Sequence, residues 1–139
     1  MSTSAEQFVG RWKLVHSEQF DEYMAEVGIG LITRKLAGSV KPTLEIKVDG
    51  DTWHVNQLST FKNTTLDFTL GVEFDETTPD GRTFKSTITL ENGKVVHVQR
   101  KIKAADKEST ITRWIEGDRL ITTLQSGAVV SRREYIREL

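Results

Sequence analysis

The feature that most constrains this chain is the regular recurrence of tight-turn signals between runs of alternating polarity. Pairs such as Asp-Gly and Asn-Gly are typical of the turns that join neighbouring antiparallel strands. They occur at Val48–Asp51, Pro79–Gly81, Glu91–Gly93, Glu116–Asp118 and Ser126–Gly127. The pattern predicts a meander of ten strands at about 8–18, 42–49, 52–59, 60–68, 72–77, 82–90, 94–102, 109–116, 119–126 and 129–137.

Composition supports a mostly β fold. Thr, Val and Ile supply 38 of the 139 residues, and Pro42 and Pro79 are the two prolines of the sequence. β-branched side chains favour strands. Ten short antiparallel strands must stack as a sandwich or close as a barrel to cover their edges. The length suits one domain, spanning residues 1–139.

The charge balance and the absence of cysteine exclude several classes of function. Lys and Arg total 19 against 20 Asp and Glu, which argues against a nucleic-acid partner. Without cysteine there is neither a disulfide nor a thiolate metal site. The N-terminal residues do not resemble a secretion signal, and no apolar run of about 18 residues occurs. We expect a soluble intracellular protein with no cofactor and no metal.

One stretch, between the first two strands, has helical rather than strand periodicity. Its apolar residues recur at i, i+3, i+4 and i+7, at Phe20, Tyr23, Met24 and Val27. Gly28 is placed to end this helix. A second helix is predicted after Gly30, with Ile32 and Leu36 four residues apart. A helix-turn-helix inserted in a meander indicates a lid over a barrel end or a sheet face.

Candidate catalytic residues are few. Each histidine falls in a predicted strand, where a surface or satisfied core position is the more common role: His16, His54 and His97. Three carboxylates flank a predicted turn, where acidic residues favour local hydrogen bonds in solvent: Asp75, Glu76 and Asp80. We therefore interpret these carboxylates as solvated turn residues.

Two adjacent arginines in the last strand carry more information. Side chains alternate between the faces of a strand, so Arg132 and Arg133 must point in opposite directions. In a closed barrel without a bulge, one of them faces the interior. Arg113 shares its face with isoleucines on both sides, at Ile111 and Ile115, which suggests burial.

A guanidinium inside a barrel is costly unless an anion or several acceptors complete it. A ligand carboxylate held by Arg113, Arg133 and the hydroxyl of Tyr135 matches this need in geometry and charge. Alternatively, Arg133, Glu134 and Arg137 form a solvent-facing ladder of charges with neighbouring strands. Strand parity alone leaves both interpretations open.

Several segments, in order along the whole chain, resemble the intracellular lipid-binding proteins, the fatty-acid-binding protein family. They are Phe8–Val15, Phe20–Met24, Gly28–Gly30, Lys41–Pro42, Ser59–Thr64, Leu70–Thr77 and Arg133–Tyr135. The resemblance implies an all-β fold, a ten-stranded antiparallel up-and-down β-barrel (β-clam) with a helix-turn-helix lid between the first two strands. It also implies an internal cavity for one or two long-chain carboxylates.

The resemblance assigns roles to individual residues. Arg113, Arg133 and Tyr135 match the trio that binds the ligand carboxylate. Phe61 matches the aromatic residue that guards the portal beneath the helices. The residues expected to line or cover this portal are Phe20, Tyr23, Met24, Ile29 and Thr33. We expect Phe20 and Phe61 to lie at the portal rather than near the trio.

The function implied is a non-catalytic carrier that transports a long-chain fatty acid. A retinoic-acid-type carrier is the alternative, and a small-molecule enzyme on the same barrel would need a base or nucleophile with an oriented partner. Transient membrane contact through the lid is expected from a basic cluster at Arg34, Lys35 and Lys41. We expect a monomer in the cytoplasm, with access to the nucleus left open.

Overall fold

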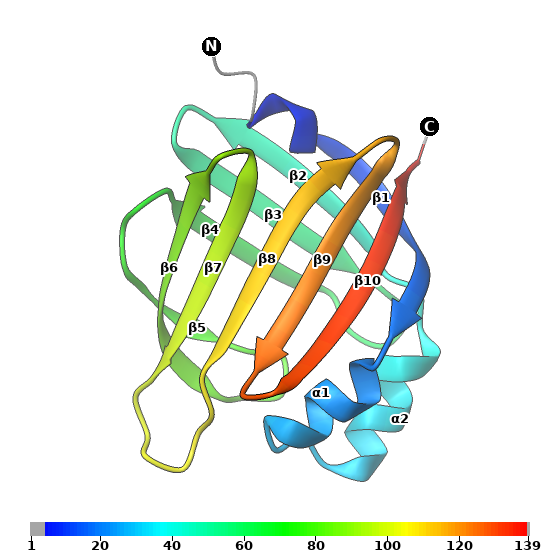
Figure 1. The fold of residues 1–139 in the computed structure, drawn as a ribbon, viewed down its shortest axis with the longest axis vertical. Helices are drawn as coiled ribbons and strands as arrows, with labels where there is room; N and C mark the ends of the chain where they lie inside the picture. Colours follow the sequence, from blue (N-terminus) through cyan, green and yellow to red (C-terminus); the bar gives the residue numbers. More distant parts are fainter. Residues whose placement is uncertain (1–4, 139) are drawn as a thin grey trace.

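A computed structural model describes residues 5–138 and contains ten strands, two α-helices and one 3-10 helix (Figure 1). The helices are η1 (Glu6–Phe8), α1 (Phe20–Glu26) and α2 (Leu31–Ser39). The strands are β1 (Gly10–Glu18), β2 (Thr43–Asp49), β3 (Thr52–Leu58), β4 (Thr64–Thr69), β5 (Phe74–Thr77), β6 (Thr83–Glu91), β7 (Lys94–Lys101), β8 (Ser109–Glu116), β9 (Arg119–Ser126) and β10 (Val129–Arg137).

All ten strands form one antiparallel sheet that curls into a nearly closed barrel. The order is β4-β3-β2-β1-β10-β9-β8-β7-β6-β5, so the pairing of β1 with β10 joins the two ends of the chain. In the described chain, β4 and β5 lie at the two ends of this order and do not pair with each other. The predicted up-and-down barrel, with its two helices between β1 and β2, is confirmed (Figure 1).

Among the strand boundaries that differ from the prediction, two have identifiable reasons. The predicted strand 60–68 begins at Thr64, because Ser59 Oγ accepts bonds from the backbone amides of Phe61 and Lys62 at 3.2 and 3.0 Å. This local turn replaces the first part of the strand. The first strand begins at Gly10 rather than at residue 8, because Phe8 ends η1 and is fully buried.

Aromatic side chains fill the end of the barrel near η1. The ring of Trp53 lies 5.7 Å from that of Phe8 and 5.9 Å from that of Phe68, and Phe68 lies 6.2 Å from Phe74. Trp12 donates from Nε1 to the carbonyl of Phe8 at 2.9 Å, which fixes η1 over this end. Packed aromatic rings exclude water, so this end of the barrel is a closed core.

The two helices cover the opposite end (Figure 1). The buried face of α1 and of the turn after it carries Tyr23, Met24 and Val27, and Tyr23 Oη donates to Ser109 Oγ at 2.8 Å. This bond fastens α1 to the start of β8. No residue of α2 is fully buried. Within residues 5–138, neither helix has the length and apolar character needed to cross a bilayer.

A β-bulge in β1 changes which side chains face inward. Leu14 pairs with Tyr135 and His16 pairs with Glu134, so Val15 is an extra residue. An extra residue reverses the alternation beyond it. As a result Ser17 pairs with Arg133, on the inner face of β10, whereas His16 lies on the outer face beside Glu134.

Candidate functional site

A cavity of about 620 Å³ lies inside the barrel beneath the lid. This volume is within the range of small-molecule sites. All nine residues singled out in the sequence line this one cavity: Phe20, Tyr23, Met24, Ile29, Thr33, Phe61, Arg113, Arg133 and Tyr135. The structure therefore brings together residues from the lid, a turn and two strands near the end of the chain.

Three polar residues form a row across neighbouring strands of the cavity wall. Thr122 of β9 is the register partner of both Arg113 on β8 and Arg133 on β10. Register partners in a sheet point to the same face, so these three side chains share the inner face. Arg133 is 6% exposed, and it is the inward member of the adjacent arginine pair, as strand alternation predicts.

Arg133 contacts neutral groups from the first strand and the lid. Its Nη1 donates to Ser17 Oγ at 2.9 Å, and its guanidinium carbon lies 3.7 Å from the ring centre of Phe20. The expectation that Phe20 lies away from the trio is wrong, because α1 packs against β10 and presses this ring onto the arginine. Phe20 lines the cavity at Arg133, where it contributes a cation–π contact.

Arg113 is the least satisfied charge in the cavity. Its Nε is buried and has no hydrogen-bond partner within the described chain. Burial lowers the pKa of this guanidinium, and the nearby Tyr135 and Glu76 offset part of that effect. Since a buried donor without an acceptor is costly, Arg113 favours the arrival of an anion.

The charged groups inside the cavity do not balance. Arg82 pairs with Asp80 at 2.6 Å, and Glu76 accepts a bond from His97 at 2.7 Å. Arg113 and Arg133 remain without a dedicated carboxylate among the described residues. Apart from Lys62 at the exposed rim, the lining thus holds three guanidinium groups against two carboxylates. Among these groups one positive charge is in excess, and one bound monovalent anion would neutralise it.

Residues of α2 and of two turns of the sheet, after β3 and after β5, also line the cavity. Phe61, in the turn between β3 and β4, is 39% exposed and lines the cavity together with Thr33 of α2. Lys62 Nζ donates to the carbonyl of Pro79 at 2.7 Å, which joins this turn to the one after β5. Phe61 is therefore a partly exposed residue of the cavity lining, and its role in guarding a portal stays a prediction.

Comparison with known proteins establishes the family. The sequence pattern of the family described as "Lipocalin / cytosolic fatty-acid binding protein family" matches residues 9–138. The chain belongs to this family. Among its relatives, fatty acid-binding protein homolog 5 of Caenorhabditis elegans is 76% identical over 135 residues, which cover 97% of this chain and 99% of the relative.

Solved structures of family members agree with the fold. The apo form of lipid binding protein 8 of Caenorhabditis elegans has a TM-score of 0.94 and 52% identity, covering 96% of each chain. A Schistosoma mansoni fatty acid binding protein, solved in complex with arachidonic acid, has a TM-score of 0.91 and 36% identity, covering 98% of this chain and 99% of that one.

The sequence analysis did not identify one polar part of the cavity wall. Glu76 is not a solvated turn carboxylate: its side chain is 11% exposed and lines the cavity. Alternation along β5 could have indicated this, since Glu76 shares a face with the half-buried Phe74. Asp75, on the opposite face, pairs with Lys85 at the surface, and Asp80 is held in its turn by Thr78 and Arg82.

The three histidines have different surroundings. His16 and His54 are half-exposed and contact Glu18 and Asp67 at 2.8 and 2.7 Å, as expected for surface positions. His97 is 2% exposed and lines the cavity. Its Nδ1 is buried and has no partner within residues 5–138, so it is not a satisfied core histidine.

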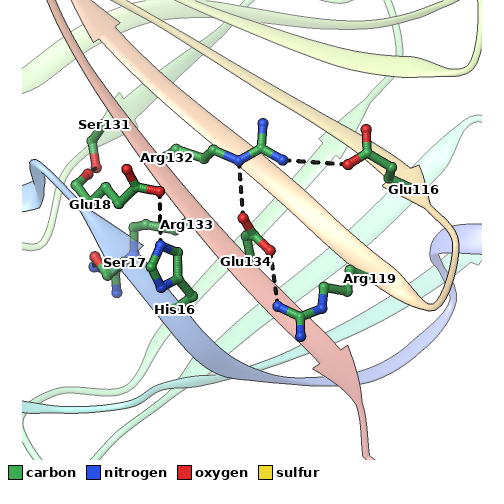
Figure 2. A network of polar contacts seen from close by, with 9 residues as sticks. All are labelled: His16, Ser17, Glu18, Glu116, Arg119, Ser131, Arg132, Arg133 and Glu134. Atoms are coloured by element: carbon green, nitrogen blue, oxygen red, sulfur yellow. Dashed lines mark hydrogen bonds and ion pairs between the residues drawn. The ribbon is translucent and has the colours of Figure 1, made fainter.

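A polar network on the outer face of β1 and β10 resembles a cation site only in spacing (Figure 2). Ligand atoms of His16, Glu18 and Glu134 lie within 4.8 Å of one another. Glu134, however, accepts bonds from Arg119 and Arg132 at 2.9 and 3.1 Å. Two guanidinium groups on this carboxylate disfavour a bound cation, so the network serves as a set of surface ion pairs.

Proposed function

We propose that this protein is a carrier that binds a long-chain fatty acid inside the barrel and transports it. The observation that carries the proposal is the unbalanced guanidinium charge at Arg113 and Arg133 in a cavity that many apolar side chains also line. A fatty acid supplies one carboxylate for this charge and an apolar chain for the rest. Relatives named as fatty acid-binding proteins support the same ligand class.

Most of the binding energy comes from the chain rather than from the head group. Burying a methylene contributes about 0.8 kcal/mol, so a chain of about sixteen carbons offers about 12 kcal/mol before ordering costs. The arginines then set orientation and head-group specificity. In this proposal Arg113, Arg133 and Tyr135 hold the carboxylate, and the buried hydroxyl of Thr122, which has no partner in the described chain, lies between the two arginines.

Comparing an acid with its ester tests the head-group assignment. Hexadecanoic acid should bind at least about tenfold more tightly than methyl hexadecanoate, because the ester leaves both guanidinium charges uncompensated. Isothermal titration calorimetry on protein stripped of endogenous lipid measures both affinities. Equal affinities for acid and ester would refute the proposed site.

We also propose that α2 makes transient contact with membranes during transfer. Its apolar residues Leu31, Ile32 and Leu36 are 55%, 78% and 48% exposed. Lys35 lies beside them and is exposed, whereas Arg34 is engaged with Asp21 at 3.0 Å and with a backbone carbonyl. The basic cluster expected from the sequence is therefore smaller than predicted.

Transfer kinetics test the membrane proposal. In wild type, the rate of fatty-acid transfer to anionic vesicles should rise with vesicle concentration, and Ile32→Ser should reduce this dependence. Val72→Ser is a matched control, because Val72 is 54% exposed in the turn after β4. A rate that ignores vesicle concentration in wild type would indicate release through water instead.

The remaining parts of the proposal concern the form in which the carrier acts. We propose a monomer that works in the cytoplasm without catalysing a reaction. The family, described as cytosolic fatty-acid binding proteins, supports the carrier role and the compartment. Incubation of the protein with a fatty acid, followed by mass spectrometry of the recovered lipid, should return it unchanged.

A further inference from the structure

The wall of the cavity formed by β5, β6 and β7 carries a second polar cluster, separate from the arginine row. Glu76 Oε1 accepts bonds from His97 Nε2 and from Ser86 Oγ, each at 2.7 Å. Glu76 Oε2 accepts a longer bond from Gln99 Nε2 at 3.3 Å. These four residues, from three neighbouring strands, form what we call the Glu76–His97 centre.

The Glu76–His97 centre is buried yet charged. Ser86, His97 and Gln99 are 0%, 2% and 4% exposed. Burial acts to raise the pKa of the Glu76 carboxyl, but the bonds from His97, Ser86 and Gln99 outweigh it and the pKa is lowered. The carboxylate is therefore ionised at neutral pH, and Glu76, His97 and Gln99 all line the space that the acyl chain would occupy.

Two hydrogen-bonding groups of the centre remain unused. An ionised carboxylate offers about four lone-pair sites, and Glu76 receives three bonds, one of them long. His97 Nδ1 is buried without a partner in the described chain. A methylene group can satisfy neither atom. A purely aliphatic chain would leave these two hydrogen-bonding sites desolvated without a partner.

Strand register places the centre beside the interior of a bound chain. His97 pairs with Ile111, two positions from the pair between Val95 and Arg113, which is about 7 Å along the wall. In the same direction, Gln99 pairs with Ser109, the residue that Tyr23 of the lid contacts. The centre thus lies between the arginine row and the lid.

We propose that the Glu76–His97 centre is a second polar subsite, which binds a hydroxyl group on the interior of the acyl chain. The inference rests on the proposed carrier function and specifies its ligand class as hydroxylated long-chain monocarboxylic acids. A hydroxyl can donate to the unused lone pair of Glu76, whereas a ketone has no proton to donate. A second carboxylate would be repelled by the charge of Glu76.

A positional series of ligands tests the subsite in the wild-type protein. The probes are octadecanoic acid, hydroxyoctadecanoic acids with the hydroxyl at successive carbons, and the matching ketones. A hydroxyl without a partner in an apolar cavity should weaken binding about ten- to hundredfold. At one interior position, the hydroxy acid should instead bind within about threefold of octadecanoic acid or more tightly, and the ketone at that carbon should lose about tenfold.

Variants then assign the effect to the centre. Glu76→Leu should lower the affinity for the favoured hydroxy acid, relative to octadecanoic acid, by about tenfold. Octadecanoic acid itself should bind to this variant at least as tightly as to wild type. Glu76→Gln keeps the side-chain shape if the leucine variant does not fold, and should give a smaller drop in the same ratio. Asp75→Asn is the matched control, because Asp75 lies on the outer face of the same strand.

The outcomes separate this inference from the proposed function. A uniform loss for every hydroxyl position in wild type, or a ratio unchanged in Glu76→Leu, would overturn the subsite while octadecanoic acid still bound. If octadecanoic acid itself failed to bind, both the carrier function and the subsite would be overturned.

Discussion

Replacing Arg113 by glutamine should stabilise the ligand-free protein while weakening its hold on a fatty acid. Arg113 is half-buried, its Nε is buried without a partner in the described chain, and desolvation lowers the pKa of its guanidinium. Removing an uncompensated buried charge should raise the free energy of unfolding by about 1 to 3 kcal/mol. For a domain of this size, each kcal/mol raises Tm by about 3 to 5 °C.

The same substitution should lower the affinity for hexadecanoic acid about ten- to hundredfold, because a charge-assisted hydrogen bond contributes about 1.5 to 3 kcal/mol. The affinity for the methyl ester should change little. Urea unfolding of lipid-free protein, followed by tryptophan fluorescence, measures stability, and calorimetry measures both affinities.

Arg132→Gln is the matched control for this prediction. Arg132 lies on the outer face and pairs with Glu134 and Glu116 at 3.1 and 3.4 Å, so its loss should change stability by less than about 1 kcal/mol and leave ligand selectivity intact. If Arg113→Gln destabilised the lipid-free protein by more than about 1 kcal/mol, the reasoning from an unpaired charge would be refuted. An unchanged acid-to-ester ratio would remove Arg113 from the head-group site.

Three further predictions concern the chain, the opening and acid stability. Affinity for saturated acids should rise from about ten to sixteen carbons with a negative heat-capacity change, and a flat series by calorimetry would contradict a cavity that encloses the chain. Phe61→Ala should change stopped-flow uptake and release rates more than acid-to-ester selectivity, whereas Phe20→Ala should reduce that selectivity, because Phe20 contacts Arg133. If Phe20→Ala instead changed mainly the rates and Phe61→Ala mainly the selectivity, the roles assigned to these two residues would be exchanged. The pKa of Glu76 is lowered from 4.5, so its ionised form stabilises the fold above pH 4.5 and this contribution is lost as the pH falls through the folded-state pKa. Glu76→Gln should therefore show a shallower loss of unfolding free energy below pH 4.5 than wild type, and parallel curves would contradict the assignment.

Features encoded within a few neighbouring residues could be predicted from the sequence. The Asn92-Gly93 turn has positive φ at both residues, as a tight hairpin requires, and the inward position of Arg133 follows from alternation along one strand. The bulge at Val15 could not be predicted, because nothing in β1 alone shows that its alternation reverses.

Contacts between segments that are far apart in the sequence could not be predicted either. Phe20 meets Arg133 because the lid packs on β10, and Glu76 reaches His97 across an intervening strand. Each contact depends on how the sheet curls, and neither partner carries a local signal for the other. The family resemblance supplied the cavity residues of the trio but not the cluster on β5 to β7.

The barrel is held together least firmly between β4 and β5, the two strands at the ends of the sheet. Every other strand is hydrogen-bonded on both sides, whereas β4 and β5 are each bonded on one side only. Widening the barrel between them breaks no ladder bond, while widening it anywhere else breaks a whole row. Expansion of the cavity for a bulkier chain would therefore cost the torsion of the connection after β4 and the single bond from Lys62 to the Pro79 carbonyl, instead of a whole row of ladder bonds.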